Sequence, residues 1–396
     1  MDTFIEFRKR ENIRPVNLPN KEKFYYDLQN IEHSWSGRAD IMSLGNTFIM
    51  EAEQQLVNAI ELFEQGYFDC AYYSLRSAVD ISTTIVFLAD MPESDRDNYL
   101  NKWKTTADFP MHGQMLKMLS THGDAFVDMK KQMPSFFSNA KTLSAELNKY
   151  VHKQGFQHFY VSRNHPINMK KSSERFIADF EDYFIKCTGV VAVMRLAIDP
   201  FPVLLMEEEV LFRCYDSITD PYSTDFVDEY IGKETLETYK TTAMYTGMRE
   251  YFMSLEKKND AVFDIVKNQY IDSQRKEDTL NQIHLLSKSD IVSALVVFAC
   301  EKIVKVYLDN VWQWYYTDRH SNRKSCSWSS VSLSNFLKAE NKINQVYEEV
   351  YVSAYWFDEN GYLLEHNVPL DETDMSLIDN ALAKARFYLD TMEHCD

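Results

Sequence analysis

The stretch YFDCAYYSLRSAVDISTTIVFLA, residues 67–89, predicts a long helix that buries one of its faces. Its apolar and small side chains recur three or four residues apart, which is the spacing of one face of an α-helix. The preceding stretch, LGNTFIMEAEQQLVNAIELFEQ at 44–65, has the same pattern, and only Gly66 separates the two. A single glycine between two amphipathic helices favours a sharp reversal of the chain. We therefore expect an antiparallel helical hairpin within a larger bundle.

The composition indicates a mainly α protein with more than one domain. The chain has 396 residues, which is more than a single core usually organises. Hydrophobic residues make up 45% of the chain and aromatic residues 14%, so a large core can form. Only 10 glycines and 10 prolines are present, and this low content favours long helices over sheets rich in tight turns.

The order of patterns along the chain predicts four segments. Charged, aromatic and turn-forming residues at 1–43 indicate an N-terminal arm, and helical patterns at 44–198 predict a bundle of four main helices. Three prolines without helical periodicity indicate a linker at 199–226. Residues 227–396 predict an α-rich C-terminal domain with a small β-hairpin near 349–368, where Asn360-Gly361 is a turn signal. Its expected helices lie at 227–256, 258–272, 287–309 and 373–392.

Charge and cysteine usage restrict the partners and the compartment. Lys and Arg total 42 and Asp and Glu total 60, so the net charge is −18 and broad DNA binding is not expected. RNA or a nucleotide would need a local patch. The six cysteines are widely spaced and contain no Cys-x-x-Cys pair, which suits reduced thiols in the cytoplasm. The N-terminus has no secretory signal pattern, and the apolar runs are too short to cross a membrane.

The stretch LSAELNKYVHK, residues 143–153, contains the most informative polar residues. On a helix, Ser144, Asn148 and His152 fall along one edge of the apolar stripe that is centred on Leu147. Histidine is the usual acid–base residue near neutral pH, and asparagine can orient it or donate to an oxyanion. We expect these three side chains to face a groove or a neighbouring helix.

The helix pair with YYSLRSAVD in its second member, followed by LNKYVHK, resembles the HEPN superfamily of helical nucleotide-binding domains. The resemblance covers roughly residues 44–198. It implies an α-helical bundle that commonly dimerises. Many HEPN proteins are metal-independent ribonucleases in toxin–antitoxin and anti-phage systems, and others only bind nucleotides or partners. A role in bacterial defence or stress is what the resemblance implies.

His152 matches the histidine of the HEPN catalytic motif, whereas the expected arginine positions hold Ala145, Glu146 and Leu147. Arg76 is the candidate substitute, because it lies at the edge of the stripe of its own helix. Arg76 and Asp80, four residues apart, could equally form a simple ion pair. His152 could equally cap the C-terminus of its helix.

Four residues make up the candidate binding surface, namely Ser144, Lys149, Lys153 and Arg163. Cations interleaved with nearby aromatic residues can hold phosphates and stack bases. A metal site is not expected, because His152, His158 and His165 do not share a helix face. No Gly-rich phosphate loop or His-Glu-x-x-His motif is present, and no cofactor is predicted.

Three functions fit these observations. The leading hypothesis is an HEPN-like protein that binds a nucleotide, RNA or a protein partner. The second is a metal-independent endoribonuclease with His152 as acid–base, Asn148 in support and Arg76 for charge. The third is a structural homodimer of helical scaffolds. The first two place the same polar edge at the centre of function.

Overall fold

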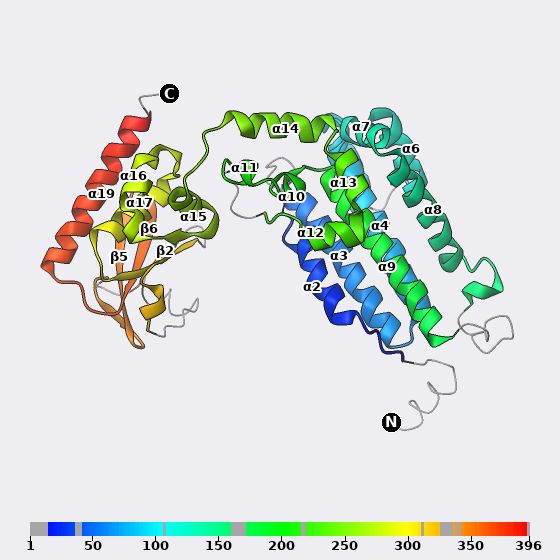
Figure 1. Ribbon diagram of the computed structural model, residues 1–396, viewed down its shortest axis with the longest axis horizontal. Coiled ribbons are helices and arrows are strands. Elements are labelled where there is room, and N and C mark those ends of the chain that lie inside the picture. Colours follow the sequence, from blue (N-terminus) through cyan, green and yellow to red (C-terminus); the bar gives the residue numbers. More distant parts are fainter. Residues whose placement is uncertain are drawn as a thin grey trace, which may run out of the picture. The chain divides into compact units, whose positions relative to one another are not determined.

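The computed structural model describes residues 15–35, 42–105, 108–159, 172–214, 219–309, 313–324, 336, 338 and 342–393. It divides into two compact units (Figure 1). The helical unit comprises Met1–Leu211 and Ile218–Leu255, and the sheet unit comprises Phe212–Ser217 and Glu256–Asp396. The mainly α class predicted from the sequence is confirmed. In the described part of the chain, no helix has the length and apolar character needed to cross a membrane.

The predicted helical hairpin is present in the helical unit. It consists of α3 (Met42–Glu64) and α4 (Phe68–Ala89). Gly66 has a φ of 86°, a conformation that glycine adopts without strain. The Gly66 N–H donates to the Phe63 carbonyl at 3.0 Å, and the Tyr67 N–H donates to the Leu62 carbonyl at 2.8 Å. These bonds satisfy the last carbonyls of α3 and turn the chain back into α4.

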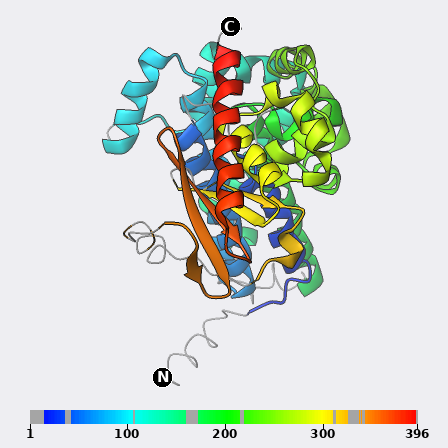
Figure 2. The ribbon, with the colours of Figure 1, turned by 90° about the vertical axis from the view of Figure 1, so that its left-hand side faces the viewer.

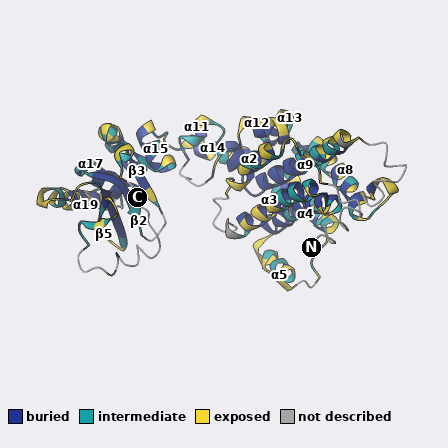
Figure 3. Ribbon diagram, turned by 90° about the horizontal axis from the view of Figure 1, so that it is seen from below, coloured by how far each residue is buried: buried dark blue, intermediate teal, exposed yellow. Residues whose placement is uncertain are grey.

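Aromatic contacts join the hairpin to two more long helices, α8 (Pro134–Val151) and α9 (Ser173–Leu196). The Phe63 and Phe180 rings stack with centroids 3.9 Å apart, and the Tyr72 and Tyr150 rings stack at 4.0 Å. Figure 3 shows buried residues along α3, α4 and α9. The other α-helices described before residue 173 are α2 (Lys21–Glu32), α5 (Glu93–Thr105), α6 (His112–His122) and α7 (Asp124–Gln132).

The helical unit continues past the end of the predicted bundle at residue 198. The segment 199–226 was expected to be a linker, but 199–211 and 218–226 belong to the helical unit and carry buried apolar residues. Phe212–Ser217 belongs to the sheet unit, which takes up the chain again from Glu256. The Tyr222 hydroxyl donates to a carbonyl of α9 at 3.1 Å, and the Tyr239 hydroxyl donates to another at 3.0 Å. Proline stops a helix without removing the chain from the core.

The elements described between residues 199 and 255 are short. They are α10 (Phe201–Leu204), α11 (Glu208–Leu211), α12 (Thr224–Phe226), the π-helical turn η3 (Val227–Ile231), α13 (Lys233–Tyr239) and α14 (Ala243–Ser254). The single helix expected at 227–256 is therefore interrupted. Gly232 has a φ of 86° and ends η3, and the side chain of Thr242 caps α14.

The sheet unit contains six described strands in the order β1-β3-β2-β6-β5-β4. The strands are β1 (Tyr270–Ile271), β2 (Ile303–Leu308), β3 (Trp314–Thr317), β4 (Gln345–Tyr347), β5 (Val350–Phe357) and β6 (Asn360–His366). The pair β1–β3 is parallel and the other pairs are antiparallel. Helices α15 (Asp260–Asn268), α17 (Lys288–Ala299) and α19 (Glu372–Glu393) share one apolar core with the strands. Figure 2 shows α19 in front of the strands. The helix α16 (Lys276–Asn281) completes the unit.

The predicted hairpin is confirmed as β5–β6, but it belongs to a larger sheet. The helix expected at 287–309 is wrong in its second half, where α17 ends at Ala299 and β2 begins at Ile303. Isoleucine and valine suit both a buried helix and a buried strand, so periodicity alone does not separate the two. Pairing with β3 and β6 decides in favour of the strand.

Candidate functional site: a polar cluster around Arg76

The structure brings two of the predicted site residues, Arg76 and Asn148, into direct contact. Arg76 lies on α4 and its side chain is only 12% exposed. Its Nε–H donates to Oδ1 of Asn148 on α8 at 3.1 Å. Its Nη1 forms an ion pair with Asp80, one helical turn further along α4. The expected Arg76–Asp80 pair is therefore present, and it is part of a larger cluster.

His112, the first residue of α6, joins this cluster through Asp80. Its Nδ1 lies 2.7 Å from Oδ1 of Asp80. Burial lowers the pKa of His112 to about 4, and the positive charge of Arg76 acts in the same direction. The imidazole is therefore neutral near pH 7.

Packing of the two long helices fixes the position of the cluster. Leu75 and Leu147 are fully buried, and Tyr72 of α4 stacks on Tyr150 of α8. This stack sets the register of α8 against α4, and Asn148 consequently faces Arg76. The local sequence makes each helix amphipathic, and the aromatic stack then determines which polar edges meet.

The other predicted residues of α8 lie around the cluster. Ser144 is half-buried one turn before Asn148, and Lys149 is exposed. His152 is the exposed C-cap residue of α8, and its backbone N–H donates to the Asn148 carbonyl at 2.8 Å. Among the described residues, no hydrogen bond or ion pair joins the His152 side chain to Arg76 or Asp80. His152 therefore lies beside the cluster as a capping residue.

The predicted binding residue Lys153 contacts α4 one turn before Arg76. It has a φ of 54°, forms an ion pair with Asp69, and its Nζ lies 5.3 Å from the centroid of the Tyr73 ring. Arg163 and His165 lie outside the described residues. The described part of the chain contains no group of three or more His, Cys, Asp or Glu side chains that could hold a metal ion.

The sequence reasoning did not find His112. It lies outside every apolar stripe, and nothing near it in the chain resembles a catalytic motif. The available signal was weak, namely a histidine at the start of a short helix after Pro110. Only the packing of α6 on α4 brings His112 to Asp80. Asp80 was recognised only as the helical partner of Arg76.

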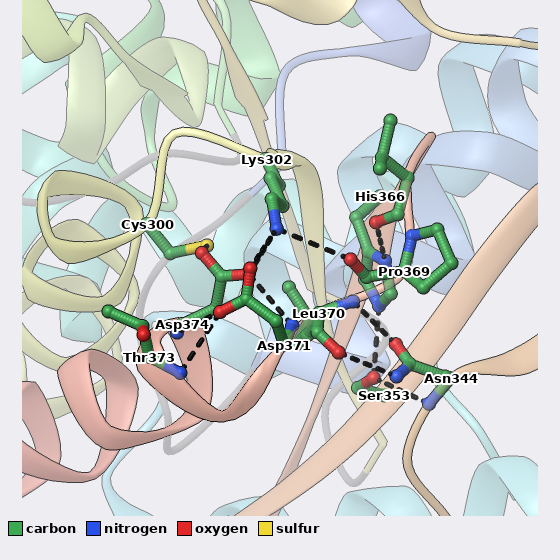
Figure 4. A network of polar contacts seen from close by, with 11 residues as sticks. Cys300, Lys302, Asn344, Ser353, His366, Pro369, Leu370, Asp371, Thr373 and Asp374 are labelled. Carbon is green, nitrogen blue, oxygen red and sulfur yellow. Dashed lines mark hydrogen bonds and ion pairs between the residues drawn. The ribbon is translucent and has the colours of Figure 1, made fainter.

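A second polar network lies in the sheet unit and includes a serine–histidine pair (Figure 4). Ser353 Oγ is 2.9 Å from Nε2 of His366, and Nδ1 of His366 is 2.8 Å from the Val368 carbonyl. Both side chains are fully buried. A nucleophile must reach its substrate, so this pair serves the structure by joining β5 to β6.

The same view includes a charged part of this network at the N-terminus of α19. Lys302 forms ion pairs with Asp371 and Asp374, and the Sγ atom of Cys300 lies 3.8 Å from Oδ1 of Asp374. Burial raises the pKa of the Cys300 thiol, which keeps it protonated and unreactive. These contacts anchor α19 to the strands.

Comparison of the chain with protein-family models, with curated proteins and with solved structures finds no match.

Proposed function

We propose that the helical unit binds a phosphate-bearing ligand, a nucleotide or an RNA strand, at the cluster of Arg76, Asn148 and His112. The observation that supports this proposal is the fixed orientation of the Arg76 guanidinium between Asp80 and Asn148. A guanidinium has five N–H donors in a planar fork that fits phosphate oxygens. The two contacts described for Arg76 use Nε and Nη1, so other N–H groups of the fork can bind a phosphate.

Residues near the Arg76 cluster favour an RNA strand over a single nucleotide as the ligand. The chain carries a net charge of −18, so a polyanion can approach only where cations are concentrated. Lys149 is exposed next to Asn148, and Lys153 lies over the half-exposed ring of Tyr73. An aromatic ring beside a cation is the combination that stacks a base and holds its phosphate.

The test is a titration of the full chain with AMP and, separately, with a short single-stranded RNA. We expect Arg76→Ala to weaken binding of the preferred ligand about 10- to 100-fold, because a charged hydrogen bond contributes about 1.5–3 kcal/mol. The matched control is Arg175→Ala. Arg175 also pairs with an aspartate four residues on, Asp179, but its side chain is 73% exposed. Equal weakening in both variants, or no binding by the unaltered protein, contradicts the proposal.

A second candidate is metal-independent RNA cleavage at the same cluster. It is favoured by a neutral His112 within 2.7 Å of Asp80 in the same cluster as Arg76, because an imidazole that is neutral near pH 7 can accept a proton. His112 would take the proton of the ribose 2′-hydroxyl, and the 2′-oxygen would attack the adjacent phosphorus. Arg76 would stabilise the charge on phosphorus, and the leaving 5′-oxygen would be protonated by an acid, for which His152 is the candidate.

Cleavage is tested with RNA in the presence of a metal chelator. We expect His112→Ala to lower the rate by about 100-fold or more. His152→Ala distinguishes the two roles considered for His152. Loss of the helix cap alone should leave the rate unchanged, whereas loss of the acid should lower it. If the unaltered protein binds RNA without cleaving it, the binding function stands and the enzymatic one does not. Protection of cells against phage by the unaltered chain, lost in Arg76→Ala, would support the defence role that the resemblance implies.

A further inference from the structure

A groove of about 410 Å³ lies in the helical unit, and its lining includes none of Arg76, Asn148 and His112. Residues of α8, α9, η3 and α13 line it. Its apolar lining consists of Phe136, Ala140, Leu143, Val190 and Ile231. A volume of this size is in the range of small-molecule sites.

Gly189 of α9 allows η3 to line the groove. A Cβ atom at this position would lie 2.0 Å from the carbonyl oxygen of Tyr230, so only glycine permits the approach. The Tyr230 hydroxyl donates to Oδ2 of Asp27 at 2.7 Å, and the Gly232 N–H donates to the Val227 carbonyl at 2.7 Å. This part of the lining is therefore fixed at several points before any ligand binds, which lowers the entropic cost of binding.

The charges at the groove favour a positively charged ligand. The carboxylate of Glu146 is half-buried and lines the groove. It accepts a hydrogen bond from the Tyr183 hydroxyl at 3.2 Å, and this neutral partner does not cancel the negative charge of the carboxylate. Lys186 also lines the groove, but its Nζ forms an ion pair with Asp182 at 2.6 Å. A carboxylate beside apolar side chains matches a cation with a hydrocarbon body.

We propose that this groove binds a small protonated aliphatic amine. The ammonium group donates to Glu146, and the methylene chain lies against Leu143 and Val190. The ligand is opposite in charge to the phosphate proposed for the Arg76 cluster. The two sites are tested independently, because Glu146 takes no part in the contacts described for Arg76.

The experiment is a calorimetric or NMR titration of the full chain with n-butylammonium, and with n-butanol as a neutral probe of similar size. Three variants accompany it. Glu146→Gln removes the charge of the groove and keeps an acceptor for Tyr183. Ala140→Leu fills the groove. Glu234→Gln removes the same charge from an exposed residue next to Thr235 of the groove and is the matched control. Thermal melting checks that each variant is folded.

We expect saturable binding of one n-butylammonium, weakened about tenfold or more by both Glu146→Gln and Ala140→Leu and unchanged within twofold by Glu234→Gln. The cation should also bind at least tenfold more tightly than n-butanol. The proposal is overturned if binding does not saturate, or if Glu234→Gln weakens it as much as Glu146→Gln does, because the net charge of the chain then explains it. Equal binding of n-butanol also overturns it.

Discussion

Lowering the pH from 7 to 5 should destabilise the helical unit through His112. The folded pKa of His112 is about 4, and the ordinary histidine pKa that applies to the unfolded chain is about 6.5. Between these two values the unfolded state binds the proton and the folded state does not. The contribution to stability is therefore complete above about pH 6.5 and is lost as the pH falls toward 4.

The size of the effect follows from the same two values. A difference of about 2.5 pKa units corresponds to a total of about 3 kcal/mol, of which about 2 kcal/mol is lost between pH 7 and pH 5. The side chain of His112 is only 15% exposed, so solvent screening removes little of this difference. The loss is large beside a typical domain stability of about 5–15 kcal/mol.

The assay is urea denaturation of the full chain, followed by far-ultraviolet circular dichroism at pH 7 and pH 5. His112→Gln replaces the imidazole by a neutral amide, and it should be less sensitive to this pH change than the unaltered protein by about 2 kcal/mol. His122→Gln is the matched control, because His122 ends the same helix and is exposed. If the unaltered protein and His112→Gln lose the same free energy of unfolding, His112 is not held neutral and the acid–base reasoning fails.

Four other predictions concern stability, fragments and assembly. Burial beside Glu32 raises the pKa of Glu53 to about 7. Glu53→Gln should therefore raise the free energy of unfolding by about 1–2 kcal/mol at pH 8 and give no gain below about pH 4.5. Chemical denaturation at both pH values checks this. Gly189→Ala should cost about 1–3 kcal/mol in thermal melting, whereas Gly247→Ala, which meets no atom within 4 Å, should cost nothing. The fragment 15–255 should melt cooperatively and 44–198 should not, because the shorter one lacks the packing of 199–255; a cooperative melt of 44–198 would contradict this boundary. Light scattering should give the mass of a dimer, and a mass of 46.6 kDa would contradict self-association.

Much of the local structure could be predicted from the sequence. The hairpin of α3 and α4 followed from two amphipathic patterns and Gly66, and the turn signal at Asn360-Gly361 marked β5–β6. Ser172 caps α9, where its Oγ accepts from the Arg175 N–H at 3.2 Å, and serine is a residue type preferred at this position. These features depend on residues close together in the chain, and such residues carry their own conformational preference.

The candidate site was only partly predictable for the same reason. The edge positions of Arg76 and Asn148 followed from helical geometry, but their contact depends on the register that Tyr72 and Tyr150 set between α4 and α8. His112 joined them through the packing of α6, which no local pattern encodes.

The sequence by itself determined the mainly α class, the helical hairpin and the edge on which the polar residues lie, because periodicity and turn chemistry act over a few residues. Only the tertiary structure decided that residues 199–211 and 218–255 belong to the helical unit, that β2 is a strand in a six-stranded sheet, and that Asp80 lies close to both His112 and Arg76. These outcomes depend on which apolar faces bury each other, and that choice is made by the free energy of the whole packed core.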